Sequence, residues 1–216
     1  MRAVHEADAL AWLDQHALPQ RCGVLTSLPN VDEFAHRDLD RWRAWFVDAA
    51  ERTIARTPAG AACVFFQTDI RHGGTWIDKS FLLQLAAQRV DGAALLWHKL
   101  ALRAPLGTTT NERPGYAHLL CFARNLTLAD DSACPDVLPA LGRMTWARAI
   151  GVDVATWAVR WLRDHARAAT IVDPFCGVGT VLAIAEREGL DAIGVERNPG
   201  RAAKARALRL GGETGG

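Results

Sequence analysis

The stretch TIVDPFCGVGT at residues 170–180 combines residue types whose spacing suits the binding of a nucleotide-like ligand. Its apolar run ends at Asp173, and a Gly-x-Gly turn follows at Gly177 and Gly179. Glycines let a ligand approach the backbone, and the helix expected after them presents free N–H groups at its N-terminus. A second apolar run ends at Glu196, about twenty residues further on, where an acid can accept hydrogen bonds from ribose hydroxyls.

This motif departs from the dinucleotide-binding pattern, because Leu182 stands where that pattern has a third glycine. An acid directly before Pro-Phe-Cys-Gly-x-Gly instead resembles motif I of the class I S-adenosylmethionine (SAM)-dependent methyltransferases. In that family the loop lies beneath the methionine end of SAM, and the acid after the second strand binds the ribose. The resemblance implies SAM as the cofactor, bound by Asp173, Pro174, Phe175, Cys176, Gly177, Gly179, Thr180 and Glu196. The alternative is an ordinary strand–turn–helix unit without a ligand.

Composition sets broad limits on the class of protein. The chain has 216 residues, of which 50% are hydrophobic and 23% charged, as expected for a globular protein of one large or two small domains. A net charge of +1 provides no overall field that would attract nucleic acid or acidic lipid. The apolar runs are too short to span a membrane, and the first residues contain no apolar signal core. We therefore expect no membrane partner.

The five cysteines are scattered and include no Cys-x-x-Cys pair, which argues against a disulfide framework and against a zinc site. We expect no bound metal and a reducing, cytoplasmic location. Methylation of a pyrimidine carbon would need a cysteine nucleophile beside the site. Neither Cys134, in an irregular stretch, nor Cys176, inside the glycine loop, suits that role.

Apolar segments of strand length alternate with helical patterns along the whole chain. The predicted strands cover residues 22–26, 61–67, 93–97, 116–124, 170–173 and 192–195. One predicted helix begins after Asp8, and the others cover residues 38–56, 78–90, 153–167, 181–188 and 201–210. Residues 68–76 are predicted to be a loop. This alternation predicts a Rossmann-like, doubly wound α/β fold with a mostly parallel sheet and helices on both faces. Ligands of such sheets bind at the carboxyl ends of the strands.

The order of the motifs resembles the circularly permuted β-class amino-methyltransferases that act on DNA bases. The SAM-like motif comes late, whereas Ser27-Leu28-Pro29-Asn30 stands near the start, where that family has Ser/Asp/Asn-Pro-Pro-aromatic. Asp8 matches the acid that receives the adenine amino group of SAM, and residues 96–99 and 113–118 resemble later strands of the family. We predict one domain over 1–216, with a catalytic-loop part (1–124), an irregular connection (125–150) and a SAM-binding part (151–210).

The resemblance implies that Ser27, Leu28, Pro29 and Asn30 form the catalytic loop. The Ser27 hydroxyl and the Leu28 carbonyl can accept hydrogen bonds from an exocyclic amino group and turn its lone pair towards the methyl group. Asn30 replaces the aromatic residue that stacks on a flipped base in the family, so the loop departs from the pattern. Trp76 or Phe34 could supply the stacking. Asp69 is a candidate substrate-facing acid, although a loop cap is an equal alternative.

The substrate is predicted from what lies between the last strand and the SAM motif. DNA-specific members of the class insert a recognition domain there, but only about twenty irregular residues, 125–145, fill this gap. This favours RNA, such as tRNA or rRNA, as the substrate. DNA and a small molecule are alternative substrates, and a catalytically degenerate scaffold subunit is an alternative of another class. A homodimer or a partner subunit would help so neutral a chain to hold a large RNA.

Overall fold

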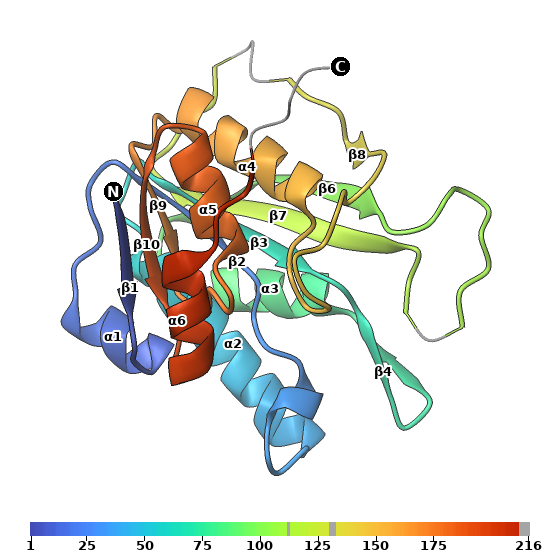
Figure 1. Cartoon of the computed structure of the whole chain (residues 1–216). Coiled ribbons are helices and arrows are strands. Elements are labelled where there is room, and N and C mark those ends of the chain that lie inside the picture. Colours follow the sequence, from blue (N-terminus) through green and yellow to red (C-terminus); the bar gives the residue numbers. More distant parts are fainter. Residues whose placement is uncertain (112, 130–132, 212–216) are drawn as a thin grey trace.

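The computed structural model of the chain contains an eight-stranded sheet and describes residues 1–111, 113–129 and 133–211. Its strands are β1 (Arg2–His5), β2 (Cys22–Thr26), β3 (Ala62–Gln67), β6 (Ala93–Leu102), β7 (Tyr116–Arg124), β8 (Val137–Leu138), β9 (Thr170–Asp173) and β10 (Asp191–Val195). They follow the order β1-β10-β9-β2-β3-β7-β6-β8 (Figure 1). In this described sheet β7 alone runs antiparallel to its neighbours. The predicted mostly parallel α/β sheet is confirmed.

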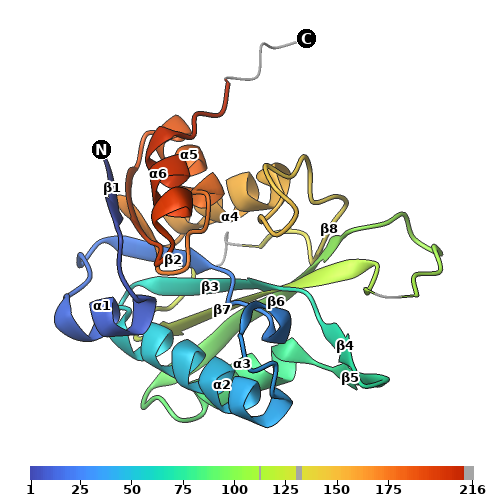
Figure 2. The same cartoon turned by 60° about the horizontal axis from the view of Figure 1, so that its bottom comes forward.

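Helices cover both faces of the sheet, as predicted (Figure 2). One face carries α1 (Ala9–Gln15), α2 (Leu39–Arg56) and α3 (Lys79–Ala87), and the other carries α4 (Val152–Asp164), α5 (Thr180–Arg187) and α6 (Pro199–Ala207). Neighbouring strand residues alternate between the two cores. Val24 and Phe65 pack with the buried residues of α2 and α3, whereas Leu25 and Phe66 pack with those of α4 and α5. Strands buried on both faces explain the nearly continuous apolar runs.

Aspartates begin three of these helices as predicted. Asp8 accepts hydrogen bonds from the backbone N–H groups of residues 10 and 11, Asp38 from that of Arg41, and Asp78 from that of Phe81. Each side chain satisfies a donor that has no partner within the helix itself. None of the helices in the described part of the chain combines the length and the apolar character needed to cross a membrane.

Several predicted boundaries were wrong. The predicted loop 68–76 contains a hairpin, β4 (Ile70–His72) and β5 (Thr75–Ile77), because Gly73 and Gly74 both adopt positive φ and form a two-residue turn. The predicted strand 93–97 continues to Leu102 past a bulge near Trp97, and the irregular connection contains β8. Residues 2–5, too short to assign from sequence, form β1 beside β10. The helix ends differ from prediction by a few residues.

The strand order places both parts of the chain in one sheet. β1 pairs with β10, and β2 pairs with β9, so strands from residues 1–124 lie on both sides of the β9–β10 pair. From β9 the chain continues through α5 to β10 on one side, and from β2 it continues through α2 to β3 on the other. Such a reversal of direction opens a crevice at the carboxyl ends of the two strands. The circular permutation itself stays a prediction from the motif order.

Candidate functional site

A cleft lies at this edge of the sheet, and most of the predicted site residues line it. They are Asp8, Ser27, Leu28, Pro29, Asn30, Asp69, Asp173, Pro174, Phe175, Cys176, Gly177, Thr180 and Glu196. Gly179 and Trp76 are the two predicted residues outside the lining. Residues from opposite ends of the chain, such as Asp8 and Glu196, therefore contribute to one site.

Asp173 joins the two central strands of the sheet. Its Oδ1 accepts hydrogen bonds from Thr26 Oγ1 on β2 (2.7 Å) and from the backbone N–H of Phe175 (3.1 Å). The carboxyl is buried, and its burial raises the pKa from 3.8 to about 7, with a further contribution from the charge of Glu196. A cationic ligand in the cleft would favour the ionised form of this acid.

The glycine loop is shaped by close packing. Gly177 and Gly179 have φ values of 54° and 86°, in the left-handed region that favours glycine. A Cβ on Gly179 would lie 2.8 Å from the Cα of Ala205, so this glycine lets α6 pack closely on the loop. Cys176 is buried, which raises the pKa of its thiol, and a Cβ on Gly194 would meet its Sγ at 2.8 Å. Cys176 therefore packs in the core and is unsuited to act as a nucleophile.

Two further acids stand at the predicted cofactor positions. Glu196 follows β10, and its Oε1 accepts a hydrogen bond from Asn198 N–H (2.7 Å), which fixes the side chain at the cleft. Asp8 caps α1 through Oδ1. Within the described residues no hydrogen bond engages Oε2 of Glu196 or Oδ2 of Asp8. Both carboxylates thus keep one oxygen for a ligand.

The loop after β2 is held by residues that the sequence did not suggest. The carbonyl of Pro29 accepts a hydrogen bond from Trp42 Nε1 (3.0 Å), and Asn30 N–H donates to Glu33 Oε1 (3.0 Å). The ammonium group of Lys79 donates to the side-chain oxygen of Asn30. While Lys79 is protonated its ammonium group can only donate, so the amide oxygen of Asn30 faces Lys79 and its NH₂ group points elsewhere.

Lys79 is unusual among charged residues because its side chain is 1% exposed. Its Nζ also lies 3.3 Å from Gln67 Oε1 and 5.8 Å from the ring centres of Trp42 and Phe46. Burial lowers its pKa to about 7, against the opposing charges of Asp69 and Glu33. Sequence reasoning missed Lys79 because the residue after a helix cap normally lies on the surface. The short apolar helix around it was the available signal.

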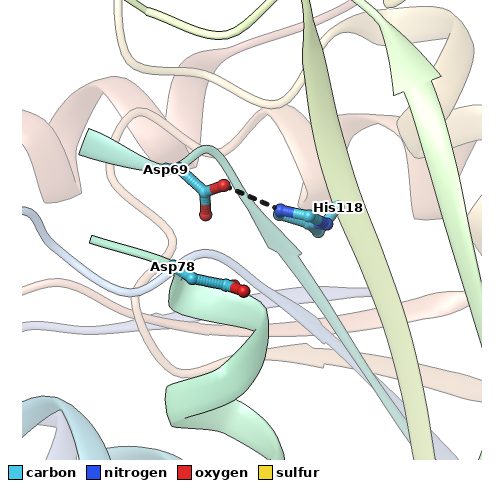
Figure 3. Close-up of side chains that lie close together, drawn as sticks. All are labelled: Asp69, Asp78 and His118. Atoms are coloured by element: carbon cyan, nitrogen blue, oxygen red, sulfur yellow. Dashed lines mark hydrogen bonds and ion pairs between the residues drawn. The ribbon is translucent and has the colours of Figure 1, made fainter. Parts of the chain in front are cut away.

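Asp69 belongs to a chain of hydrogen bonds, of which Figure 3 shows the one to His118. Its Oδ1 accepts from Lys79 N–H (2.9 Å) and its Oδ2 lies 3.0 Å from His118 Nε2, while His118 Nδ1 lies 2.9 Å from His98 Nε2. Asp69, His118 and Asp78 can bring three metal-ligating atoms within 4.8 Å of one another. Each of these groups already has a hydrogen-bonding partner, so we interpret the cluster as a structural network.

Aromatic residues form part of the wall. Phe34 packs against Trp45, with ring centres 4.7 Å apart, and Trp45 packs against Phe175 at 5.9 Å. Phe34, one of the two predicted stacking residues, therefore lies in the cleft. Trp76, the other, is 39% exposed on the β4–β5 hairpin, where the guanidinium of Arg71 lies 5.4 Å from its ring. Its predicted contact with substrate stays a prediction.

Comparisons with known proteins identify the fold. No family model and no curated protein sequence matches the chain. Among solved structures, TTHA0409 from Thermus thermophilus, described as a putative DNA modification methylase, superposes with a TM-score of 0.75 at 18% identity over 96% of this chain and 94% of that chain. PvuII DNA methyltransferase (cytosine-N4-specific) gives 0.77 at 13% identity over 99% and 88%. The complex of M1.HpyAVI with SAM gives 0.65 at 14% identity over 96% and 99%.

These similarities confirm the predicted class of fold, because the chain has the Rossmann-like fold of class I SAM-dependent methyltransferases over nearly its whole length. More particularly, two of these structures are described as a putative DNA modification methylase and as a DNA methyltransferase, in agreement with the predicted resemblance to the β-class enzymes. At identities of 13–18% the similarity establishes the fold alone.

Proposed function

We propose that this protein is a SAM-dependent methyltransferase that acts on an exocyclic amino group of a base in DNA. One observation carries the proposal. The crevice between β9 and β2 brings together the glycine loop, the Ser27–Asn30 loop and two carboxylate oxygens that make no hydrogen bond within the described residues. A binding site for the methyl donor and a binding site for the acceptor base would thus share one cleft.

The residues present fit SAM. Glu196 would hold the ribose hydroxyls, Asp8 the adenine amino group, and the loop of Phe175 and Gly177 the methionine end. Asp173 would place an acid near this positively charged ligand. When bound, SAM supplies a methyl group that is already activated for transfer. The protein then needs mainly to orient the acceptor and to exclude water.

The acceptor side is formed by the loop after β2. The Ser27 hydroxyl and the Leu28 carbonyl would accept hydrogen bonds from the amino group and so direct its lone pair. Asn30 provides a hydrogen-bond donor where the family has an aromatic ring, because Lys79 fixes its amide oxygen. We infer that this loop recognises the base partly by hydrogen bonds, with Phe34 and Trp45 as the aromatic surface.

The substrate polymer is either DNA or RNA, and different observations favour each. The structural neighbours described as DNA methylases support DNA and give no support to the RNA preference that the sequence suggested. RNA is the second candidate, because the described residues of the 125–150 connection contain only the two-residue strand β8. Action in the cytoplasm, a small-molecule substrate, a scaffold role and self-association or a partner subunit all stay predictions.

Mass spectrometry of nucleosides from a strain that lacks the gene tests the proposal. We expect one N-methylated nucleoside to disappear from genomic DNA and to return when the wild-type gene is restored, but not when a gene encoding Ser27→Ala is restored. Loss from tRNA or rRNA alone would select the RNA candidate. Unchanged DNA and RNA would contradict methylation of nucleic acid.

A further inference from the structure

Two arginines, Arg103 and Arg113, line the cleft together with Lys79. Arg103 follows β6, and its backbone N–H donates to the carbonyl of Gly115 (2.8 Å), just before β7. Arg113 comes from the connection that leads into β7, and both side chains line the cleft. Arg103 is half-buried, and its Nη1 lies 3.4 Å from the hydroxyl of Thr68, another residue of the lining.

Among the described residues no ion pair involves Arg103 or Arg113, whereas Arg148 in the same lining binds Asp32 and Glu33 at 3.0 and 3.1 Å. The nearby acid Asp69 is already engaged by His118 and by the backbone of Lys79. Burial, and then the charge of Arg113, lower the pKa of Arg103. A half-buried guanidinium beside a like charge, as at Arg103, is unfavourable unless an anion joins the two.

We propose that Arg103 and Arg113, together with the Thr68 hydroxyl, bind a phosphate of the nucleic acid strand beside the base that enters the cleft. Guanidinium groups suit this ligand because their forked N–H donors match the oxygens of a phosphate. The inference rests on the proposed function. It narrows the substrate to a nucleic acid strand, because a free base or a small amine carries no phosphate for this site.

The β4–β5 hairpin beside the pair carries residue types that suit contact with a nucleic acid strand. Arg71 on β4 donates through Nη1 to the carbonyl of Asn111 (3.3 Å), which ties the β4–β5 hairpin to the β6–β7 connection. Figures 1 and 2 both show these two segments projecting from the same side of the molecule. The exposed ring of Trp76 lies on the hairpin, next to Arg71. Arginine and an aromatic ring are the residue types that proteins use along single strands.

The test uses the full chain and a fluorescently labelled, single-stranded DNA oligonucleotide of mixed sequence. We expect Arg103→Gln/Arg113→Gln to bind the oligonucleotide at least about tenfold more weakly than the wild type. The plot of log affinity against log salt concentration should also become shallower, its negative slope smaller in magnitude by about one or two. Arg113→Gln alone changes an exposed side chain and should show a smaller loss without affecting folding. Arg56→Gln, at an arginine outside the cleft lining, removes one positive charge as Arg113→Gln does and serves as its control.

Binding and methyl transfer are measured together so that two failures can be told apart. Oligonucleotide affinity and salt slope equal to those of the wild type in the double variant and in Arg113→Gln would overturn the phosphate site. The proposed function fails separately if wild-type protein transfers no methyl group from SAM to the oligonucleotide. SAM affinity, measured by calorimetry, should be the same in all four proteins, and a loss confined to SAM binding would also overturn the phosphate assignment.

Discussion

Asp173→Asn is expected to raise the free energy of unfolding at pH 8 and, at the same time, to weaken SAM binding about tenfold or more. The asparagine Oδ1 can still accept the hydrogen bonds from Thr26 and Phe175, so the loop keeps its shape. What the variant loses is a buried negative charge. That charge is costly in the free protein and favourable only beside a cation.

The dependence on pH follows from the raised pKa of Asp173, about 7 when folded against 3.8 ordinarily. Between these values the unfolded chain has lost the proton and the folded protein retains it, so wild-type stability falls as pH rises through this window. Urea unfolding should show a stabilising effect of Asp173→Asn that is small near pH 4 and on the order of a few kcal/mol at pH 8. Wild-type protein should also release a proton when SAM binds near pH 7.

A control and a companion variant sharpen this prediction. Glu51→Gln removes an acid that is absent from the cleft lining and should leave SAM affinity unchanged. Glu196→Ala should also weaken SAM binding, because the proposed ribose contact is lost. If calorimetry gave wild-type SAM affinity for both Asp173→Asn and Glu196→Ala, the assignment of the cofactor site would be wrong.

Lys79→Met is the variant with the largest expected effect on the acceptor side. Methionine fills a similar volume and removes a buried charge, so the protein should still fold. Without the ammonium group the side chain of Asn30 is free to turn, and the acceptor loses its orientation. We expect kcat to fall roughly 10- to 100-fold while SAM affinity stays nearly the same. Steady-state kinetics with calorimetry on the same samples measure both quantities.

The partner residue provides the check on this interpretation. Asn30→Ala should show the same pattern, and Lys79→Met/Asn30→Ala should be little worse than either single variant, because both changes break one contact. Lys204→Met, an exposed lysine on α6, is the matched control. Additive losses in the double variant, or a loss of SAM affinity with normal kcat, would refute the positioning role of Lys79.

The cofactor side of the site was accessible from sequence because its residues follow one another closely. Asp173, Gly177 and Thr180 lie in one strand–loop–helix unit, and Glu196 ends the next strand, so spacing alone placed them together. The resemblance to a known family then placed Asp8 in the same cleft. The alternation of strands and helices likewise predicted the fold, since each buried strand reads as an apolar run.

The acceptor side was less predictable because its contacts cross between distant elements. Lys79 and Asn30 are 49 positions apart, and nothing in the neighbourhood of Lys79 indicates that its side chain turns inward. Arg103 and Arg113 flank the β6–β7 connection, where arginines are ordinary surface residues. Trp76 was predicted as a substrate contact from its residue type, yet the Gly73–Gly74 turn places it on a hairpin outside the lining. Tertiary pairing decides these positions.

We propose that this cleft transfers a methyl group from SAM to an exocyclic amino group of a nucleobase. The most direct test is to incubate purified protein with isotopically labelled SAM and with DNA or RNA, digest the polymer and identify the labelled nucleoside by mass spectrometry. We expect a nucleoside methylated on its amino nitrogen, and we expect it to be absent when Asp173→Asn replaces the wild type at low SAM concentration. A label on a pyrimidine carbon, or no label in either polymer, would contradict it.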